Sequence, residues 1–245
     1  MIARMAISTR GLVKRYGRTR ALDGFTLDVP VGAILGLVGP NGAGKTTWMM
    51  SVAGFLKTDA GEISVLESGP FSASAASGRL SILPQDSELP LEMTPRALYR
   101  AFARLQGLSL SAARRTTEEV LAAVNLLSHA DKPIRALSHG MRKRVMSGQC
   151  FLGDPEVILL DEPMNGLDPE EAERMRRLIL AGAGQRTVVV SSHNLLDLER
   201  LCSHIAFVEA GRVTQVATVE ELTADGRSLE ACYLARRSAA ESEKV

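Results

Sequence analysis

The stretch Ala33-Ile-Leu-Gly-Leu-Val-Gly39-Pro-Asn-Gly-Ala-Gly-Lys45-Thr46 decides the fold of this 245-residue chain. Its first six residues are a compact apolar run, which predicts a buried strand. The next eight satisfy the pattern GxxxxGK[ST], and a helix is expected to begin at Lys45. A buried strand, a glycine-rich turn and a helix in this order predict a loop that binds phosphate groups.

The residue types of this loop suit a nucleoside triphosphate. Glycines allow successive backbone N–H groups to converge on phosphate oxygens without a clash from Cβ atoms. The positive end of the helix dipole faces the same anion, and Lys45, expected at a surface turn, adds a full charge. The Thr46 hydroxyl is a candidate ligand of Mg²⁺. The expected nucleotide-binding residues of the loop are Gly39, Pro40, Asn41, Gly42, Ala43, Gly44, Lys45, Thr46 and Thr47.

A second candidate element is the apolar run Val157-Ile-Leu-Leu followed by Asp161 and Glu162. Side chains alternate along a strand, so the two carboxylates should point in different directions. One can then reach a metal ion while the other reaches a water molecule near the terminal phosphate. Asp161 is the better metal ligand and Glu162 the better base. Strands often end in Asp or Glu, so this pattern is informative only because a complete phosphate loop occurs in the same chain.

Composition excludes several classes of protein. Lys and Arg total 29 and Asp and Glu total 28, a net charge of +1 that predicts no large nucleic-acid surface. Hydrophobic residues make up 45% of the chain, enough for a substantial core. Three widely spaced cysteines favour a reducing compartment. No apolar run approaches the roughly 20 residues of a membrane-spanning helix, so any membrane role should come from a partner.

The remaining pattern predicts an α/β fold. The first thirty residues are expected to form short strands and hairpins, and 68–78 a loop or weak helix. Strands are expected over 80–83, 157–160, 188–191 and 205–208, with helices over 169–181 and 194–202 between them. This alternation predicts a mostly parallel sheet covered by helices. Residues 85–151 are expected to form a helix-rich insertion. Its helices are expected over 95–105, from 111, and over 140–151.

Five further motifs occur in a fixed order along the chain, and together with the two elements above they resemble the ATP-binding cassette (ABC) ATPases. Leu137-Ser-His-Gly-Met141 resembles the LSGGQ signature of that family, and Gln85 matches its glutamine loop. Gly166-Leu-Asp168-Pro matches the D-loop, and His193 matches the switch histidine. Tyr16 matches the aromatic residue that stacks on adenine. The ordered set spans most of the chain.

The resemblance implies a RecA-like P-loop NTPase core with an N-terminal antiparallel β subdomain and an inserted helical subdomain. Core and β subdomain would take residues 1–84 and 152–245, and the helical subdomain 85–151. It also implies that the chain binds and hydrolyses ATP with Mg²⁺. The implied catalytic residues are Lys45, Glu162 and His193, and the implied metal ligands are Thr46, Gln85 and Asp161.

The resemblance further implies that two cassettes pair head to tail. Each ATP would lie between the phosphate loop of one chain and the signature of the other, where Ser138 and the Gly140 N–H contact the γ phosphate. Asp168 would cross the interface, and Gln85 would report the state of the nucleotide to the helical subdomain. The partner would be itself or a similar cassette.

The signature departs from the common pattern at His139 and Met141, while Ser138 and Gly140 are kept. A histidine at 139 can present its backbone if its φ is negative. Signatures that end in Gly-Met before basic residues resemble those of bacterial exporters of drugs, polysaccharides or lipids. Residues 142–144 are expected to form a solvated basic face, with contact to nucleotide or a partner as the alternative. Only 245 − 193 = 52 residues follow His193, which leaves no room for a regulatory domain and also favours export.

We therefore expect the ATPase subunit of an exporter, held at the cytoplasmic face of the membrane by a separate transmembrane permease, with no nucleic-acid partner. The alternative is a non-transport cassette protein that acts on ribosomes or DNA. Such proteins usually carry two cassettes or long coiled-coil insertions, and neither feature occurs here. A P-loop kinase or GTPase is a third class, which leaves the signature and His193 unexplained.

Overall fold

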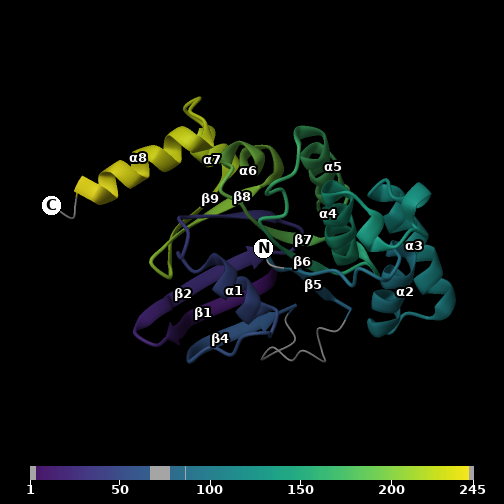
Figure 1. Cartoon of the computed structure of the whole chain (residues 1–245). Coiled ribbons are helices and arrows are strands. Elements are labelled where there is room, and N and C mark those ends of the chain that lie inside the picture. The colour runs from purple at the N-terminus through teal and green to yellow at the C-terminus, as the bar shows by residue number, and fades with distance from the viewer. Residues whose placement is uncertain (1–3, 67–77, 86, 243–245) are drawn as a thin grey trace.

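The computed structural model describes residues 4–66, 78–85 and 87–242. Most of the loop or weak helix expected over 68–78 lies outside these described residues. Two sheets form the centre of the molecule, and most helices pack around the larger one (Figure 1). Within the described ranges, no helix is both long and apolar enough to cross a membrane.

The smaller sheet is antiparallel, as the early hairpin pattern predicts. Its strand order is β2-β1-β4, and both β4 and β2 pair antiparallel to β1. The strands are β1 (Met5–Tyr16), β2 (Thr19–Pro30) and β4 (Ala60–Val65). The tight connection between β1 and β2 places Tyr16 opposite Thr19 at the tip of the hairpin.

The larger sheet has the order β5-β6-β7-β3-β8-β9, and its first five strands are parallel. β9 runs antiparallel to β8. The strands are β3 (Ile34–Val38), β5 (Leu80–Leu83), β6 (Val157–Asp161), β7 (Thr187–Ser191), β8 (His204–Glu209) and β9 (Arg212–Thr218). The predicted strand–helix alternation is therefore confirmed, because parallel neighbours require helical crossovers.

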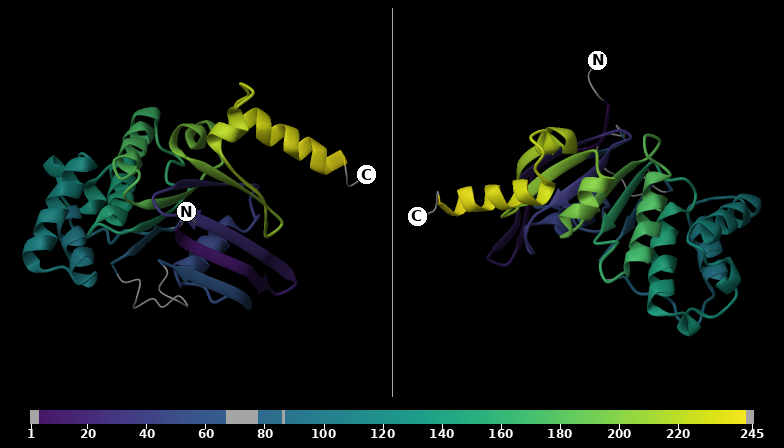
Figure 2. Two further views of the ribbon diagram at one scale, coloured as in Figure 1. Left: turned by 180° about the vertical axis from the view of Figure 1, so that it is seen from behind. Right: turned by 90° about the horizontal axis from the view of Figure 1, so that it is seen from above.

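The helices of this sheet are α1 (Lys45–Val52), α5 (Pro169–Leu180), α6 (Leu195–Leu201), α7 (Val219–Thr223) and α8 (Leu229–Ser242). Among them, α1 begins at the expected Lys45, and α5 and α6 lie within one residue of their expected bounds. α5 connects β6 to β7, and α6 connects β7 to β8. α8 projects from the body at the end opposite to α2 and α3 (Figures 1 and 2).

Between β5 and β6 the chain is helical, and these helices lie together beside one end of the larger sheet (Figure 2). They are α2 (Pro95–Leu105), α3 (Leu110–Ala123) and α4 (His139–Gly148), with the 3-10 turns η1 (Leu127–His129), η2 (Ile134–Ala136) and η3 (Gln149–Phe151). Thr94 caps α2, with Pro95 in its first turn, as predicted. α3 begins one residue before the expected Ser111, because the side chain of Ser109 accepts the capping bond from Ala112.

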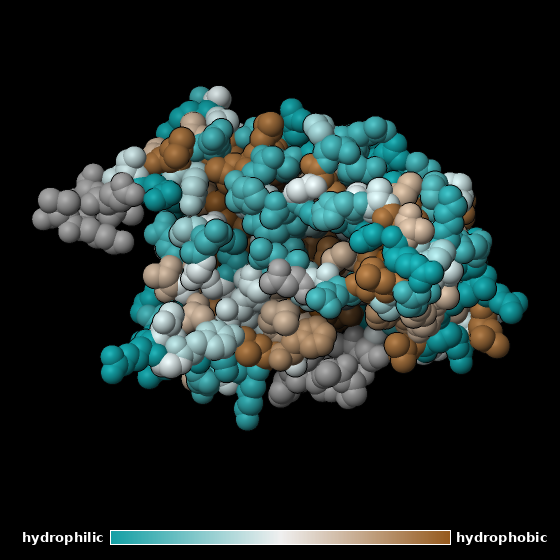
Figure 3. Space-filling view, viewed as in Figure 1, coloured by the Kyte–Doolittle hydropathy of each residue, from teal (hydrophilic) through white to brown (hydrophobic). Residues whose placement is uncertain are grey.

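Two hydrophobic clusters lie on opposite faces of the larger sheet, and β3 divides its side chains between them. Ile34 and Val38 join the cluster formed with the helices α2–α6. Leu35 and Leu37 join the cluster formed with the antiparallel sheet and α1. All five residues of β3 are buried because both faces are covered. The outer surface is mostly hydrophilic, with apolar side chains exposed over the α2–α3 end (Figure 3).

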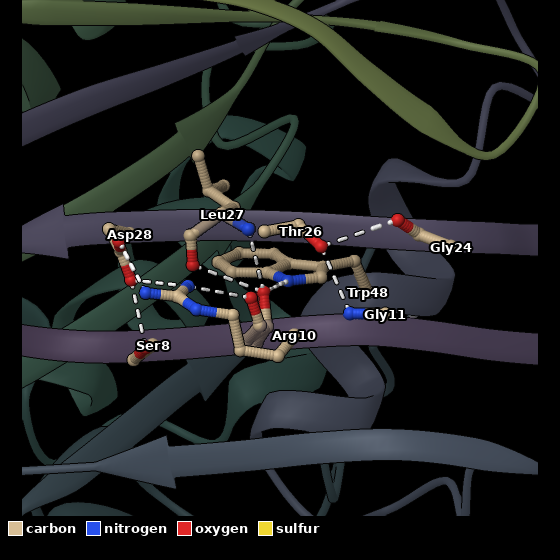
Figure 4. Close-up of polar contacts among 9 residues, drawn as sticks. Ser8, Arg10, Gly11, Gly24, Thr26, Leu27, Asp28 and Trp48 are labelled. Carbon is tan, nitrogen blue, oxygen red and sulfur yellow. Dashed lines mark hydrogen bonds and ion pairs between the residues drawn. The ribbon is translucent and has the colours of Figure 1, made fainter.

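Trp48, the only tryptophan of the sequence, ties the antiparallel sheet to α1 (Figure 4). Its ring is fully buried and stacks on Phe25, with 5.8 Å between the ring centroids. Its indole N–H donates to the Thr9 hydroxyl at 3.2 Å. The same hydroxyl exchanges two hydrogen bonds of 3.1 Å with the backbone of Leu27. One buried hydroxyl thus links β1, β2 and the helix that begins at Lys45.

Replacement of Thr9 by Val is expected to lower the free energy of unfolding by about 1–3 kcal/mol, because it leaves buried polar partners unpaired without changing side-chain shape. Urea titration followed by Trp48 fluorescence measures this change. The control is Ser8→Ala, which removes a hydroxyl that bonds Asp28 in a partly exposed position and should cost about 0.5 kcal/mol. Equal costs for the two variants would contradict the assigned role of Thr9.

Candidate functional site

The loop at residues 39–44 joins the end of β3 to the start of α1, in the context that its sequence predicts. Gly44 caps α1 with a φ of 109°, and Gly42 has a φ of 78°. A Cβ atom at Gly44 would lie 2.5 Å from the Ala21 carbonyl oxygen, and one at Gly39 would clash with the Val208 carbonyl. Gly44 is therefore required both by its φ angle and by backbone that packs against the loop, Gly39 by that backbone, and Gly42 by its φ angle.

The remaining loop residues lie where a ligand at the helix N-terminus can reach them. Pro40, Asn41, Gly42 and Thr46 are exposed, whereas Thr47 is half-buried. Ala43 is buried, and its carbonyl accepts a hydrogen bond of 2.9 Å from the Gly211 N–H in the turn between β8 and β9. That turn supports the loop from behind.

Lys45 is more buried than the expected surface turn would leave it, with an exposed fraction of 8%. Its Nζ donates to the carbonyl oxygens of Gly39 at 2.6 Å and Pro40 at 3.1 Å. Burial lowers the pKa of Lys45, and the charges of Glu162 and Asp161 oppose that shift. These carbonyls and carboxylates hold the ammonium group at the mouth of the loop.

Asp161 ends β6 and is buried, and it lies beside the loop as predicted. Its Oδ2 accepts a hydrogen bond of 2.6 Å from the Thr46 hydroxyl. Its other oxygen accepts one from the hydroxyl of Ser191, which ends β7. Ser191 is not among the residues predicted from the sequence, although it ends the strand that lies between β3 and β6 in the sheet. Parallel strands bring Asp161 and Ser191 to the same end of the sheet, where α1 presents Thr46.

Glu162 points to a different partner from that of Asp161, as the alternation predicts. Its Oε2 lies 2.9 Å from Nδ1 of His193, and its backbone N–H donates to the Ser191 hydroxyl at 2.9 Å. The Glu162 side chain is 11% exposed and that of His193 is 68% exposed. Glu162 also has a φ of 51°, an uncommon conformation for a residue with a side chain, and such strain clusters at functional sites.

Two other predicted residues lie near this centre or at its margin. Gln85, exposed just after β5, lines a cavity of about 50 Å³ together with Asp161 and Glu162. Tyr16 is 52% exposed at the tip of the β1–β2 hairpin. The ammonium group of Lys14 lies 5.8 Å from the centroid of the Tyr16 ring. The exposed ring is available for stacking.

Ser138 and Asp168 cap helices of their own. The Ser138 hydroxyl accepts from the Met141 N–H at 3.2 Å, and the Asp168 carboxylate from the Glu171 N–H at 2.9 Å. In the described part of the chain, no hydrogen bond joins either side chain to the loop at 39–46. His139 is exposed, and its φ is not positive, as expected. Gly140 follows it, half-buried in the first turn of α4.

The expectation of a solvated basic face at residues 142–144 is wrong. All three side chains bond to neighbouring elements. Arg142 donates to the Leu137 carbonyl at 3.1 Å, and Lys143 donates to the Asn165 carbonyl. Arg144 forms an ion pair of 3.0 Å with Glu171. These residues are half-buried because α4 packs against the turn before α5 and the start of that helix.

The sequence profile of the family described as "ABC transporter" matches residues 22–165, more than half of the chain. The chain belongs to the ABC transporter family. The matched region includes the phosphate loop, the signature and the two carboxylates. The phosphate loop and the two carboxylates described above therefore lie within an ABC transporter domain.

Two curated relatives show which ABC proteins this chain resembles in sequence. It is 36% identical over 211 residues to a Nod factor export ATP-binding protein I of Ralstonia nicotianae, with 84% of this chain and 65% of that protein covered. It is 37% identical over 229 residues to a daunorubicin resistance ATP-binding protein of Streptomyces coeruleorubidus, with 91% of this chain and 72% of that protein covered. The chain thus spans about two thirds of the length of the first relative.

Solved ABC structures confirm the fold class. The ATP-binding subunit of an ABC transporter matches with a TM-score of 0.83 and 25% identity, over 94% of this chain and 98% of that one. An ATP-binding cassette solved as a dimer with bound ADP and Pi, in a post-hydrolysis state, matches with a TM-score of 0.78 and 20% identity, over 87% and 98%. At that identity the second likeness shows the fold alone.

Proposed function

We propose that this chain is the ATP-hydrolysing subunit of a membrane exporter, in which ATP closes a pair of cassettes and hydrolysis reopens it. One observation carries the proposal: two adjacent carboxylates at the end of β6 are directed to different tasks. Asp161 bonds the Thr46 hydroxyl beside the phosphate loop, and Glu162 bonds His193. The curated relatives, named for export and drug resistance, support the transport role.

The donor set beside the loop fits Mg²⁺. Thr46 Oγ1 and Asp161 Oδ2 lie 2.6 Å apart, so one ion can contact both oxygens. Mg²⁺ prefers oxygen ligands and usually takes only one or two from protein, with phosphate and water as the others. We assign Thr46, Asp161 and Gln85 to this ion. When bound, Mg²⁺ would neutralise part of the negative charge of the phosphates.

The remaining residues of the site perform the hydrolysis. The backbone N–H groups of residues 39 and 41–47 bind the phosphates, and Lys45 offsets the negative charge of the phosphoryl group that is transferred. The Glu162 carboxylate, at the edge of the cavity, accepts a proton from the attacking water. His193 orients that carboxylate and contacts the γ phosphate. Tyr16 stacks on the adenine ring.

The signature and the D-loop act on the nucleotide of a second chain. Ser138 and Gly140 begin α4, whose positive N-terminal end suits a phosphate oxygen. Asp168 begins α5 and would cross the interface between the two chains. A cassette of the same fold was solved as a dimer, and we extend the pairing of two cassettes to this chain.

A separate transmembrane permease completes the transporter in this proposal. It would hold the chain at the cytoplasmic face of the membrane and contact residues 85–151, which we keep as the helical subdomain. Large hydrophobic side chains are exposed in that region at Leu91, Leu105, Leu110 and Leu127. The two curated relatives are named for export and drug resistance and not for work on ribosomes or DNA, and the net charge of +1 suits neither of those partners.

Purification of the tagged chain from detergent-solubilised membranes of its own cells tests the transport role. The expected result is co-purification with a polytopic membrane protein and an ATPase rate that changes when that protein is present. Sedimentation of the chain with ribosomes or nucleoid DNA, and its absence from the membrane fraction, would contradict the proposal.

A further inference from the structure

Two basic residues of α4 hold the turn that carries Asp168 from both sides. Lys143 Nζ donates to the carbonyl of Asn165, three residues before Asp168. Arg144 Nε lies 3.0 Å from Oε2 of Glu171, three residues after it. Six residues before Arg144, Ser138 caps the same helix. The signature and the D-loop are thus joined through side chains within one chain.

The pair formed by Arg144 and Glu171 is largely shielded from solvent, with side chains 11% and 15% exposed. The contact is an ion pair and not an aligned hydrogen bond. Within the described ranges, neither Arg144 Nε nor Glu171 Oε2 has an aligned hydrogen-bond partner. Loss of one member of such a pair leaves a buried charge without compensation. Removal of either residue therefore leaves the other as a shielded charge without its counter-ion.

The guanidinium group of Arg144 also reaches a third element. Its NH1 nitrogen donates to the carbonyl oxygens of Val124 and Asn125, each at 3.1 Å, where α3 ends. One planar group with several fixed donors joins α3, α4 and α5. A lysine ammonium, which is a single point charge, does not match this geometry.

Glu171 also lies under the start of the signature helix. A Cβ atom built on Gly140 would lie 4.0 Å from Glu171 Cγ, an ordinary van der Waals contact. The backbone N–H of Glu171 meanwhile donates to the Asp168 carboxylate at 2.9 Å. The side chain of Glu171 thus lies on the side of Gly140 where a side chain would project, while its backbone N–H satisfies the cap of α5.

We infer that Arg144 and Glu171 are positioning residues that make the signature and the D-loop move as one unit. The inference rests on the proposed function, in which both elements meet the nucleotide of a second chain. The phosphate loop lies between β3 and α1, and among the described residues no hydrogen bond or ion pair joins Arg144 or Glu171 to these elements. Loss of the pair should therefore weaken ATP-dependent pairing of two chains and leave ATP binding by one chain unchanged.

The test uses the full-length chain with Glu162→Gln as the parent, because this variant should accumulate as a closed dimer. Arg144→Lys and Glu171→Gln are added separately, below the temperature at which either unfolds. A fluorescent ATP analogue measures binding by dilute monomer, and light scattering measures the dimer constant in MgATP. We expect affinity for the nucleotide within twofold of the parent and dimerisation at least tenfold weaker. In chains that keep Glu162, kcat should fall while KM stays within twofold.

The matched control is Arg174→Lys, which alters the more exposed pair of Arg174 with Glu170 on α5. It should leave dimerisation within twofold. If Arg144→Lys and Glu171→Gln lower only the urea midpoint, and the folded proteins dimerise and turn over like their parents, the pair is structural and the inference is overturned. If the Glu162→Gln parent itself stays monomeric in MgATP, the proposed shared site fails, and the inference fails with it.

Discussion

Replacement of Glu162 by Gln is expected to lower the ATPase rate about 10²–10⁴-fold, the range in which a positioned base contributes. The amide keeps the size of the carboxylate and its hydrogen bond to His193, now 2.9 Å long, but it cannot take a proton from water. MgATP should still bind, because the loop and Asp161 are untouched. Phosphate release measures the rate, and a fluorescent ATP analogue measures the affinity.

Glu220→Gln is the control for this change, since Glu220 is exposed in α7. It should leave both the rate and the affinity unchanged. An ATPase rate of Glu162→Gln within twofold of the parent would show that another group activates the water. Loss of nucleotide binding in this variant would instead place Glu162 among the ATP-binding groups.

The second large effect is expected for Lys45→Met, which should lower ATP affinity at least about tenfold and the ATPase rate by about 10²–10³, as for other preorganised electrostatic contacts. Methionine fills the buried volume of the Lys45 stem but removes the charge and the bonds to the Gly39 and Pro40 carbonyls. Phosphate release and equilibrium binding measure both quantities. Lys132→Met, at an exposed position, is the control.

Urea titration of Lys45→Met separates chemistry from folding, because Lys45 is buried and its loss also removes two hydrogen bonds. The folded fraction should remain close to complete without denaturant. A folded Lys45→Met protein with parental ATP affinity would refute the assignment of Lys45 to the phosphates.

Much of the fold could be predicted because its signals are local. The apolar run before Gly39 and the run over 157–160 have the length and composition of buried parallel strands, and both are found in the larger sheet. Their motifs predict Thr46 and Asp161 at one Mg²⁺ site, and in the structure their side-chain oxygens lie 2.6 Å apart. The start of α3 was harder to place, because Ser109 and Ser111 are both suitable caps and only the structure selects the first.

Other features depend on packing that a sequence does not display. Ser191 reaches Asp161 because the β6–β7 register pairs those two positions, and register follows from the assembled sheet. The basic run at 142–144 has the composition of a solvated face. Arg144 is nevertheless shielded because α4 lies against α5 and the end of α3. The periodicity of a sequence indicates which side of a helix is apolar. It does not indicate which charged groups of other elements the helix will contact.

Each ATP site is proposed to combine the phosphate loop of one chain with the signature of another. Ser138→Arg places bulk and charge at the start of α4, so this variant should bind ATP but not hydrolyse it. Lys45→Met should also be inactive. A heterodimer of the two carries both lesions in one site and none in the other, where Lys45 of the first chain meets Ser138 of the second.

The most direct test is the ATPase rate of mixtures of these two inactive variants. Random pairing at equal amounts gives half heterodimers with one intact site of two, so the rate should rise to at most about a quarter of the parental rate for independent sites. We predict a maximum at the equal mixture, above the activity of either variant alone. A rate that stays at the level of the separate variants at every ratio, or normal hydrolysis by Ser138→Arg alone, would contradict the shared site.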